Sequence, residues 1–311
     1  MFNIIHGREA FYKYYSVEGA MKTLKEKKFK WSSPSVFNDP YDCQFSVFSK
    51  GSNQEIMEIL LEQLIEIALQ TRGKEPAFFL PEVQQRFNLI KRRMRDSKSN
   101  GQVRHLRNKI RSIGNFYNGN SILSNLAKTL NNRRQDFSKE VKIFCVTETN
   151  DNLLMWSHYA QEHRGLVIKI KCLPEGDGSP LCAARKVQYK NSLPCITPDI
   201  IAPILLSPGR QEYYAKIEEI YLSWFLRKSM VWSYEKEWRV ISYPLMSRRY
   251  DFYFCEFHPN EIEGIYLGAK MGNKLKTDFI TLISEEYPKC HIYQAKLREY
   301  SPGLDFFAIT D

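Results

Sequence analysis

A long helical stretch separates the strand-forming segments of this chain into two groups. Between Ser52 and about Asp136, apolar side chains recur every three or four residues, as along the buried stripe of an amphipathic helix. On both sides of this stretch, shorter aromatic and β-branched runs are typical of strands. Strands and helices do not alternate regularly as in a doubly wound sheet, so we expect an α+β fold. Residues 1–51 and 138–311 are predicted to form its core, and residues 52–137 a helical insert.

Local patterns predict the elements of the core and of the insert. Ser16 is expected to cap a helix through Leu24, and Pro81 to stand in the first turn of a helix in the insert. Two further helical segments of the insert are expected around 106–113 and 122–130. The other predicted helices cover 153–164, 211–228 and 275–287, and the predicted strands cover 11–15, 28–33, 141–146, 166–170, 187–189, 237–243, 250–257, 264–268 and 291–297.

Composition places the chain among globular proteins. Of its 311 residues, 43% are hydrophobic, 14% aromatic and 26% charged, which argues against a disordered or fibrous chain. No window approaches the ~20 uncharged apolar residues of a membrane-spanning helix, and the first residues lack the pattern of a secretory signal. The seven cysteines form no framework of paired spacings. We therefore expect a cytoplasmic protein without a membrane partner.

Positive charge is concentrated in the insert. The net charge of the chain is +10, and the segment from Arg86 to Arg111 alone holds ten basic residues and one acid. Such a concentration attracts polyanions, so we expect a nucleic acid or another anionic partner there. The alternative is a solvated helix surface without a ligand. The arginines predicted to bind nucleic acid are Arg92, Arg93, Arg95, Arg104 and Arg107.

Four short segments resemble a bacterial family known as domain of unknown function 2971. They are Phe37-Asn38-Asp39-Pro40, Met155-Trp156-Ser157-His158-Tyr159-Ala160 followed by His163 and Gly165, Trp232-Ser233-Tyr234-Glu235-Lys236-Glu237-Trp238-Arg239, and Ile265-Tyr266-Leu267-Gly268. The resemblance covers the two ends of the chain and leaves out the insert. It implies membership of a family to which no general activity is assigned.

The core also resembles the layout of ADP-ribosyltransferases. An aromatic opening strand, a tyrosine-bearing helix and a Glu-x-Glu motif follow one another, as in that fold, whose split sheet of mixed or antiparallel strands clamps NAD. The resemblance implies that NAD is the cofactor and that a strand glutamate stabilises the positive charge that develops on the ribose. Carried over to this chain, the catalytic residues are Glu237, Glu235 and His158, and the cofactor-binding residues are Tyr12, Tyr14, Asn38, Ser157, Tyr159 and Arg239.

Strand geometry predicts to which side of the sheet the side chains of the Glu-x-Glu motif point. If the motif lies on a strand, Glu235, Glu237 and Arg239 share one face, while Trp238 and Val240 point into the core. The acidic face then lines a cleft or forms an ion-paired solvent surface. The catalytic interpretation requires Tyr12, Tyr159 and Glu237 to line one pocket.

Several alternatives remain open. His158 and Tyr159 are equally compatible with structural roles, as a hydrogen-bonded histidine and a core tyrosine. The opening strand offers Tyr12-Lys13-Tyr14-Tyr15 where the transferases usually carry His or Arg, and His6 or Arg8 could substitute.

The first functional hypothesis is an NAD-dependent ADP-ribosyltransferase-like effector, a toxin or an antiphage protein, which modifies nucleic acid and has an antitoxin or other partner protein. The second is a non-catalytic nucleic-acid-binding protein. The third is a metal-dependent nuclease that uses Asp39 or Asp42, although no metal ligands are assigned.

Overall fold

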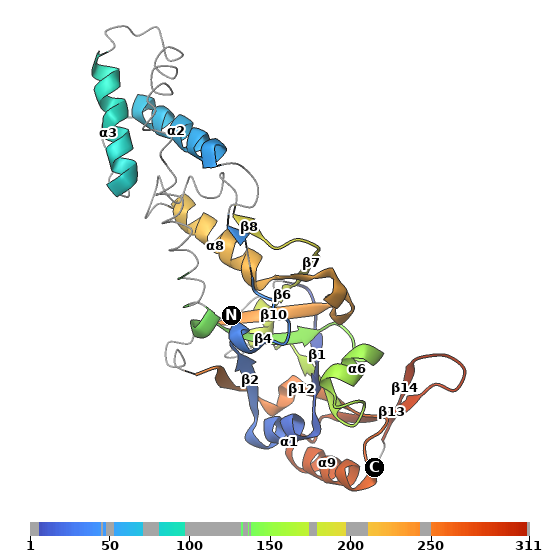
Figure 1. Cartoon of the computed structure of the whole chain (residues 1–311). Coiled ribbons are helices and arrows are strands. Elements are labelled where there is room, and N and C mark those ends of the chain that lie inside the picture. The colour runs from blue at the N-terminus through green and yellow to red at the C-terminus, as the bar shows by residue number, and fades with distance from the viewer. Residues whose placement is uncertain are drawn as a thin grey trace. The chain divides into compact units, whose positions relative to one another are not determined.

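The structure is a computed structural model that describes residues 6–44, 46–47, 53–70, 81–96, 132, 136, 138–173, 179–196, 211–242 and 250–309. The chain divides into two units (Figure 1). The first comprises Met1–Cys43, Phe137–Asn191 and Leu226–Asp311, and the second Gln44–Asp136 and Ser192–Phe225. The segment Ser192–Phe225, which the predicted boundaries place in the core, thus clusters with the insert.

A large mixed sheet forms the first unit, which confirms the predicted α+β class. Its main path runs β11-β2-β4-β1-β5-β12-β13-β14, and β10 pairs with β4 and with β6. All pairings are antiparallel except that of β12 with β13. The strands are β1 (Ala10–Tyr15), β2 (Lys28–Ser32), β4 (Lys142–Thr147), β5 (Leu166–Lys171), β6 (Arg185–Lys186), β10 (Glu237–Ser242), β11 (Phe252–Glu256), β12 (Ile262–Leu267), β13 (His291–Leu297) and β14 (Leu304–Ala308).

Hydrophobic residues fill both faces of this sheet. On β5, Leu166 and Ile168 belong to one buried cluster and Val167 to the other, as expected for side chains that alternate across a strand. The first cluster includes residues of α1 (Val17–Glu26) and α9 (Asn273–Glu286), and the second includes Trp156 of α6 (Leu153–Tyr159). Ser16 caps α1 as predicted, because its side chain accepts a hydrogen bond from the Gly19 amide.

The sheet opens around β4. This strand pairs with β10 from Lys142 to Thr147, but it pairs with β1 only between Thr147 and Tyr12 and with β2 only between Ile143 and Ser32. Along the rest of that edge, β4 makes no ladder with either described strand. The opening creates room for side chains between β1, β2 and β4.

Shorter elements complete the first unit. β7 (Gln188–Lys190) pairs in parallel with β9 (Arg227–Ser229), and the 3-10 turns are η1 (Pro34–Val36), η3 (Pro180–Ala183), η4 (Met230–Glu235) and η6 (Pro259–Glu261). Lys228 therefore lies on a strand. The predicted helix 211–228 is too long, since α8 (Gln211–Phe225) ends before it.

The helices α2 (Asn53–Gln70) and α3 (Pro81–Asp96) confirm the helical nature of the described part of the insert. α3 begins at Pro81, as predicted, and the two helices contact each other within the second unit. That unit also contains α8 and the parallel pair of β3 (Ser46–Val47) with β8 (Cys195–Ile196). The segments expected around 106–113 and 122–130 lie outside the described residues. No described helix has the length and apolarity needed to cross a membrane.

Two other predictions are corrected. The predicted helix 153–164 ends at Tyr159, because Gln161, Glu162 and His163 adopt left-handed φ angles of 49°, 54° and 69° that turn the chain back toward β5. Glu235 is not on a strand: it ends η4, and Lys236, at φ 45°, reverses the chain before β10 begins at Glu237. The C-terminal strand β14 was not predicted.

Candidate functional site

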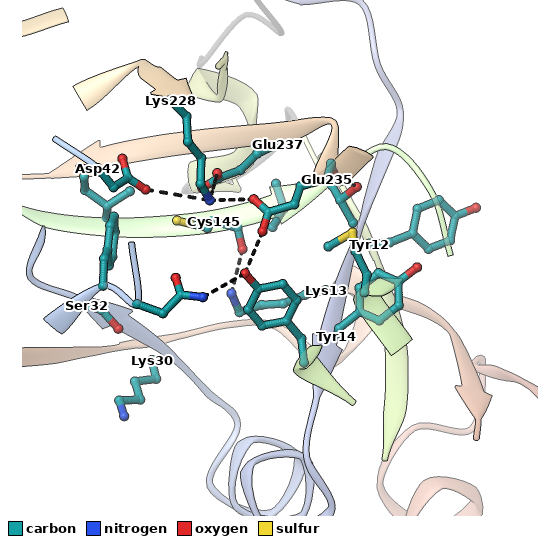
Figure 2. A pocket seen from close by; sticks show the side chains of 17 residues that line it. Tyr12, Lys13, Tyr14, Lys30, Ser32, Asp42, Cys145, Lys228, Glu235 and Glu237 are labelled. Carbon is teal, nitrogen blue, oxygen red and sulfur yellow. Dashed lines mark hydrogen bonds and ion pairs between the residues drawn. The ribbon is translucent and has the colours of Figure 1, made fainter. Parts of the chain in front are cut away.

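A cavity of about 210 Å³ lies at the opening of the sheet (Figure 2). Its walls come from β1, β2 and β4, from the segment after η1, and from α6, β9 and η4. Tyr12, Tyr159 and Glu237 all line it, together with Glu235 and Lys228. The structure thus brings together the three side chains whose convergence the catalytic interpretation requires.

Glu237 is held by two cations. Its carboxylate accepts hydrogen bonds from Arg239 Nε at 2.8 Å, from Arg239 Nη2 at 3.0 Å and from Lys228 Nζ at 3.0 Å. Burial alone would raise the pKa of Glu237, but the charges of Arg239 and Lys228 outweigh it and lower this pKa well below its usual range. Glu237 is therefore ionised at neutral pH.

Arg239 connects Glu237 to the segment after η1, where Asp42 lies. Its guanidinium donates to both carboxylate oxygens of Asp42, at 2.9 and 2.6 Å, and also contacts Cys43 Sγ at 3.4 Å. The Arg239 side chain has no exposed surface, and that of Asp42 is 2% exposed. Such a bidentate pair is both strong and directional, so it fixes the segment after η1 against β10.

Glu235 has a different environment from Glu237. One of its oxygens accepts a hydrogen bond from the Tyr159 hydroxyl at 2.6 Å, and the other accepts from Lys228 Nζ at 2.5 Å. Burial raises the pKa of Glu235 despite the opposing charge of Lys228, and the charge of Glu237 adds to this rise. The Thr147 hydroxyl donates to the Glu235 carbonyl at 2.6 Å, which anchors the end of η4 to β4.

Lys228 is the shared counterion of the acids. It lies 3.7 Å from an oxygen of Asp42, besides its contacts with Glu235 and Glu237, as Figure 2 shows. Burial would lower its pKa, but the charges of Glu237 and Glu235 outweigh this effect and raise it. Lys228 is therefore a permanent cation. One carboxyl is thus held ionised and another, nearby, has a raised pKa, an arrangement that frequently marks acid–base sites.

Tyrosines form another wall of the cavity. Tyr12 and Tyr14 line it from β1, on the right of the view, and Lys30 and Ser32 lie on the left (Figure 2). The Tyr14 hydroxyl is tied to the backbone, since it donates to the Thr149 carbonyl at 3.1 Å. Asn38 contributes to the same site, because its Nδ2 donates to the Tyr159 hydroxyl at 3.2 Å.

Three of the predicted site residues do not line the cavity. His158 is exposed and lies 3.1 Å from the Tyr234 hydroxyl, and Ser157 donates to the Leu153 carbonyl and contacts His163. Arg239 acts from behind the cavity wall, through Glu237. His158 therefore has no described contact with Asp42, Glu235 or Glu237.

Sequence patterns did not point to one central residue, Lys228. Its place at the end of an aromatic helical pattern made it look like a helix terminus, and its strand and its burial follow from tertiary packing. The sequence patterns indicate Asp42 only as a metal ligand, and Lys13 only as a departure from the transferase pattern. A lysine between aromatic residues on a predicted buried strand is the one signal that could have pointed to Lys13.

The contacts of Asp39 and Asp42 are relevant to the hypothesis of a metal-dependent nuclease. Among the described residues, no group of three or more His, Cys, Asp or Glu side chains is placed to hold a metal ion. Asp42 is committed to Arg239, and an Asp39 oxygen accepts a hydrogen bond from the Tyr41 amide at 2.9 Å, an Asx-type turn. The carboxylates are thus engaged by protein cations and backbone amides.

Of the arginines predicted to bind nucleic acid, Arg92 lies exposed on α3. The backbone of Arg93 and Arg95 belongs to the same helix, while their side chains, and the whole of Arg104 and Arg107, lie outside the described residues.

Comparison with known proteins identifies one family. Residues 155–240 match the model of a family described as protein of unknown function (DUF2971). The match confirms the resemblance seen in the Met155 and Trp232 segments, and it contains Tyr159, Lys228, Glu235, Glu237 and Arg239. No curated protein and no solved structure matches the chain significantly.

Proposed function

We propose that this cavity cleaves the bond between ribose and nicotinamide in NAD and transfers ADP-ribose to an acceptor. The observation that carries the proposal is the placement of Glu235, with its raised pKa, beside Tyr159 in a tyrosine-walled cavity. NAD is here a substrate, because the reaction consumes it. The ADP-ribosyltransferase-like layout is a prediction that supports this choice.

The main protein group that this cleavage of NAD requires is a carboxylate. When the C1′–N bond breaks, nicotinamide leaves with the bonding electron pair as a neutral molecule, and positive charge develops on the ribose ring. A carboxylate that accepts a hydrogen bond from a ribose hydroxyl stabilises this charge. Water or the acceptor then forms a new bond to C1′ and gives its proton to the same carboxylate, which acts as general base.

Glu235 suits this role better than Glu237. The oxygens of Glu237 already accept three hydrogen bonds from Arg239 and Lys228, whereas each oxygen of Glu235 accepts one. A carboxylate oxygen can accept two hydrogen bonds, so both oxygens of Glu235 retain a free position. The sequence hypothesis favoured Glu237; the contacts favour Glu235 as the catalytic residue and Glu237 as a positioning residue that holds Lys228.

The size of the cavity limits what it encloses. Its volume of about 210 Å³ is smaller than the roughly 300–1,000 Å³ of pockets that enclose drug-sized ligands. It fits the nicotinamide riboside end of NAD, and the adenosine end would lie outside. The tyrosine rings offer flat apolar surfaces to the nicotinamide.

The proposal also includes a role for the protein in the cell. A cytoplasmic effector, either a toxin or an antiphage protein, would use the basic insert to bring nucleic acid to the cavity as the acceptor, and an antitoxin or other partner would control it. Arg92, exposed on α3, is the described residue that supports this part.

The direct test is nicotinamide release from NAD by the purified full-length protein, with and without nucleic acid or lysate. We expect release by the wild type and its loss, by at least about 100-fold, in Glu235→Gln, the size of effect typical of a lost catalytic group. Glu263→Gln is the matched control, because Glu263 pairs with Lys169 away from the cavity. Absence of both NAD binding and nicotinamide release in the wild type would refute the proposal.

The non-catalytic alternative makes a different prediction. A pure nucleic-acid-binding protein would show salt-sensitive binding that Arg92→Ala weakens, while Glu235→Gln would leave every measured property unchanged.

A further inference from the structure

Lys13 has an environment that its protein contacts do not explain. It stands on β1, inside the opening of the sheet, and its ammonium donates one hydrogen bond, to the Cys145 carbonyl on β4 at 2.6 Å. Within the described part of the chain, no carboxylate lies at ion-pair distance from it. An ammonium has three donors, so two of them have no described hydrogen-bond partner.

The surroundings make this arrangement costly. The Lys13 ammonium lies 4.6 Å from the centre of the Phe144 ring and 5.8 Å from that of Tyr15, and burial lowers its pKa. The charge of Glu237 opposes this effect of burial on the pKa, and the charge of Lys30 adds to it. Lys30 lines the same cavity, and its ammonium lies 3.5 Å from the centre of the Phe252 ring rather than at a carboxylate. Two lysines with aromatic rather than acidic partners are the electrostatic pattern of an anion site.

The opposite charge gathers elsewhere in the same cavity. Glu235 and Glu237 share Lys228, as described above, and ion pairs hold together the cluster of Asp42, Glu235, Glu237, Lys228 and Arg239. Lys13 and Lys30 are outside this cluster. Glu235 and Glu237 thus line the cavity from η4 and β10, while Lys13 and Lys30 line it from β1 and β2.

From this geometry we infer that Lys13, assisted by Lys30, holds a phosphate group of the ligand. The inference rests on the proposed function for the identity of the ligand: the phosphate is the one attached to the ribose whose C1′ faces Glu235. It orients the substrate, since the phosphate end lies at Lys13 and Lys30 and the nicotinamide end near Glu235 and Tyr159.

Two ligands that differ only in one phosphate test the contact between Lys13 and the phosphate. Nicotinamide mononucleotide and nicotinamide riboside differ by a single phosphate, so the ratio of their dissociation constants measures the phosphate site alone. We expect the wild type to bind the mononucleotide about 10- to 100-fold more tightly, the value of one or two charge-assisted hydrogen bonds. Calorimetric titration of the full-length protein gives both constants.

The matching variant is Lys13→Met, which keeps the length of the side chain and removes its charge. It is expected to abolish the preference for the mononucleotide and to change riboside affinity less than about twofold. Lys274→Met, at an exposed position on α9, is the control and should keep the preference. Equal affinity of the wild type for the two ligands, or an equal loss of both in Lys13→Met, would overturn the inference.

A third probe separates this inference from the proposed function. Inorganic phosphate or pyrophosphate should raise the melting temperature of the wild type and of Lys274→Met more than that of Lys13→Met. If this occurs while neither nicotinamide compound binds, the phosphate site stands and the proposed substrate is wrong. If none of these probes binds the wild type, both are wrong.

Discussion

At the scale of single residues, two glutamates separated by one position have opposite acid–base properties. Glu237 faces Arg239 and Lys228 together, and their charges keep it ionised. Among the described residues, Lys228 is the cationic partner of Glu235, and burial raises the pKa of Glu235. The difference comes from the surroundings and not from the residue type, so neighbouring substitutions should change it.

The pH dependence of nicotinamide release is the corresponding prediction. A general base must be ionised, so the rate should fall as the pH falls through the raised pKa of Glu235, above the usual ~4.3 of a glutamate. Lys228→Met removes the charge that lowers this pKa most, and should therefore move the acid limb to still higher pH. A pH–rate profile of both proteins gives the two midpoints; an identical midpoint, or a shift to lower pH, would exclude Glu235 as the base.

Tyr159→Phe tests the hydroxyl that donates to Glu235. The change removes this hydrogen bond and the acceptor of Asn38 but keeps the ring, so we expect kcat to fall by about 10- to 100-fold, the value of one hydrogen bond to a charged group. Melting temperature should change little. Tyr293→Phe, whose ring stacks on Tyr266 away from the cavity, is a suitable control; equal kinetics in the two variants would contradict a role for Tyr159.

At the scale of helices and strands, much of the first unit could be predicted from local patterns. β1, the Ser16 cap of α1 and the bounds of β13 follow from aromatic runs, capping chemistry and alternation. The early end of α6 could not be predicted, since three residues without glycine adopt left-handed φ angles there. The turn leads the chain into β5, which pairs with both β1 and β12.

Close backbone contacts explain two glycines of the family-like motifs. A Cβ on Gly268 would lie 2.2 Å from the His163 carbonyl oxygen, and one on Gly165 would lie 2.1 Å from that of Tyr15. The left-handed turn after α6 is therefore packed directly against the end of β12. The Ile265-Tyr266-Leu267-Gly268 motif thus has a packing role.

Gly268→Ala should destabilise the protein by several kcal/mol, since two backbone segments would have to move apart, a cost at or above the ~1–3 kcal/mol of overpacked cores. Gly272→Ala is a matched control, because a Cβ there meets nothing within 4 Å. Urea unfolding of both variants measures the difference in the free energy of unfolding. Similar stability of the two variants would show that the turn adapts easily.

At the scale of the whole molecule, the site is an assembly of segments far apart in sequence. Asp42 lies 197 residues from Arg239 along the chain, and Tyr159 lies 76 residues from Glu235, yet each pair is in direct contact. Sequence patterns did not reveal Lys228, the cation that Asp42, Glu235 and Glu237 share. Sequence patterns predicted which face Trp238 and Val240 bury, and both lie in the core. They could not predict η4 or β9, because the ion pairs that hold these short elements form only in the folded chain.

Acid stability follows from this assembly. The pKa of Glu237 is lower in the folded protein than the ~4.3 expected for the unfolded chain. Its contribution to the free energy of unfolding is therefore fully present above that value and is lost as the pH falls toward the folded pKa. Glu237→Gln should cost about 3–5 kcal/mol at pH 7, because it leaves buried Arg239 and Lys228 short of a partner.

The lowered pKa of Glu237 and the cost of removing its charge together predict how the destabilisation by Glu237→Gln depends on pH. The difference in stability between wild type and Glu237→Gln should be largest near neutral pH and should shrink steadily below about pH 4, since protonation removes from the wild type the charge that the substitution removes from the variant. Urea unfolding at a series of pH values, followed by tryptophan fluorescence, measures this difference. Glu263→Gln, in a partly exposed pair, should cost less than about 1 kcal/mol at every pH. A difference for Glu237→Gln that stays constant down to pH 3 would mean that Arg239 and Lys228 do not hold the Glu237 carboxylate in its charged form.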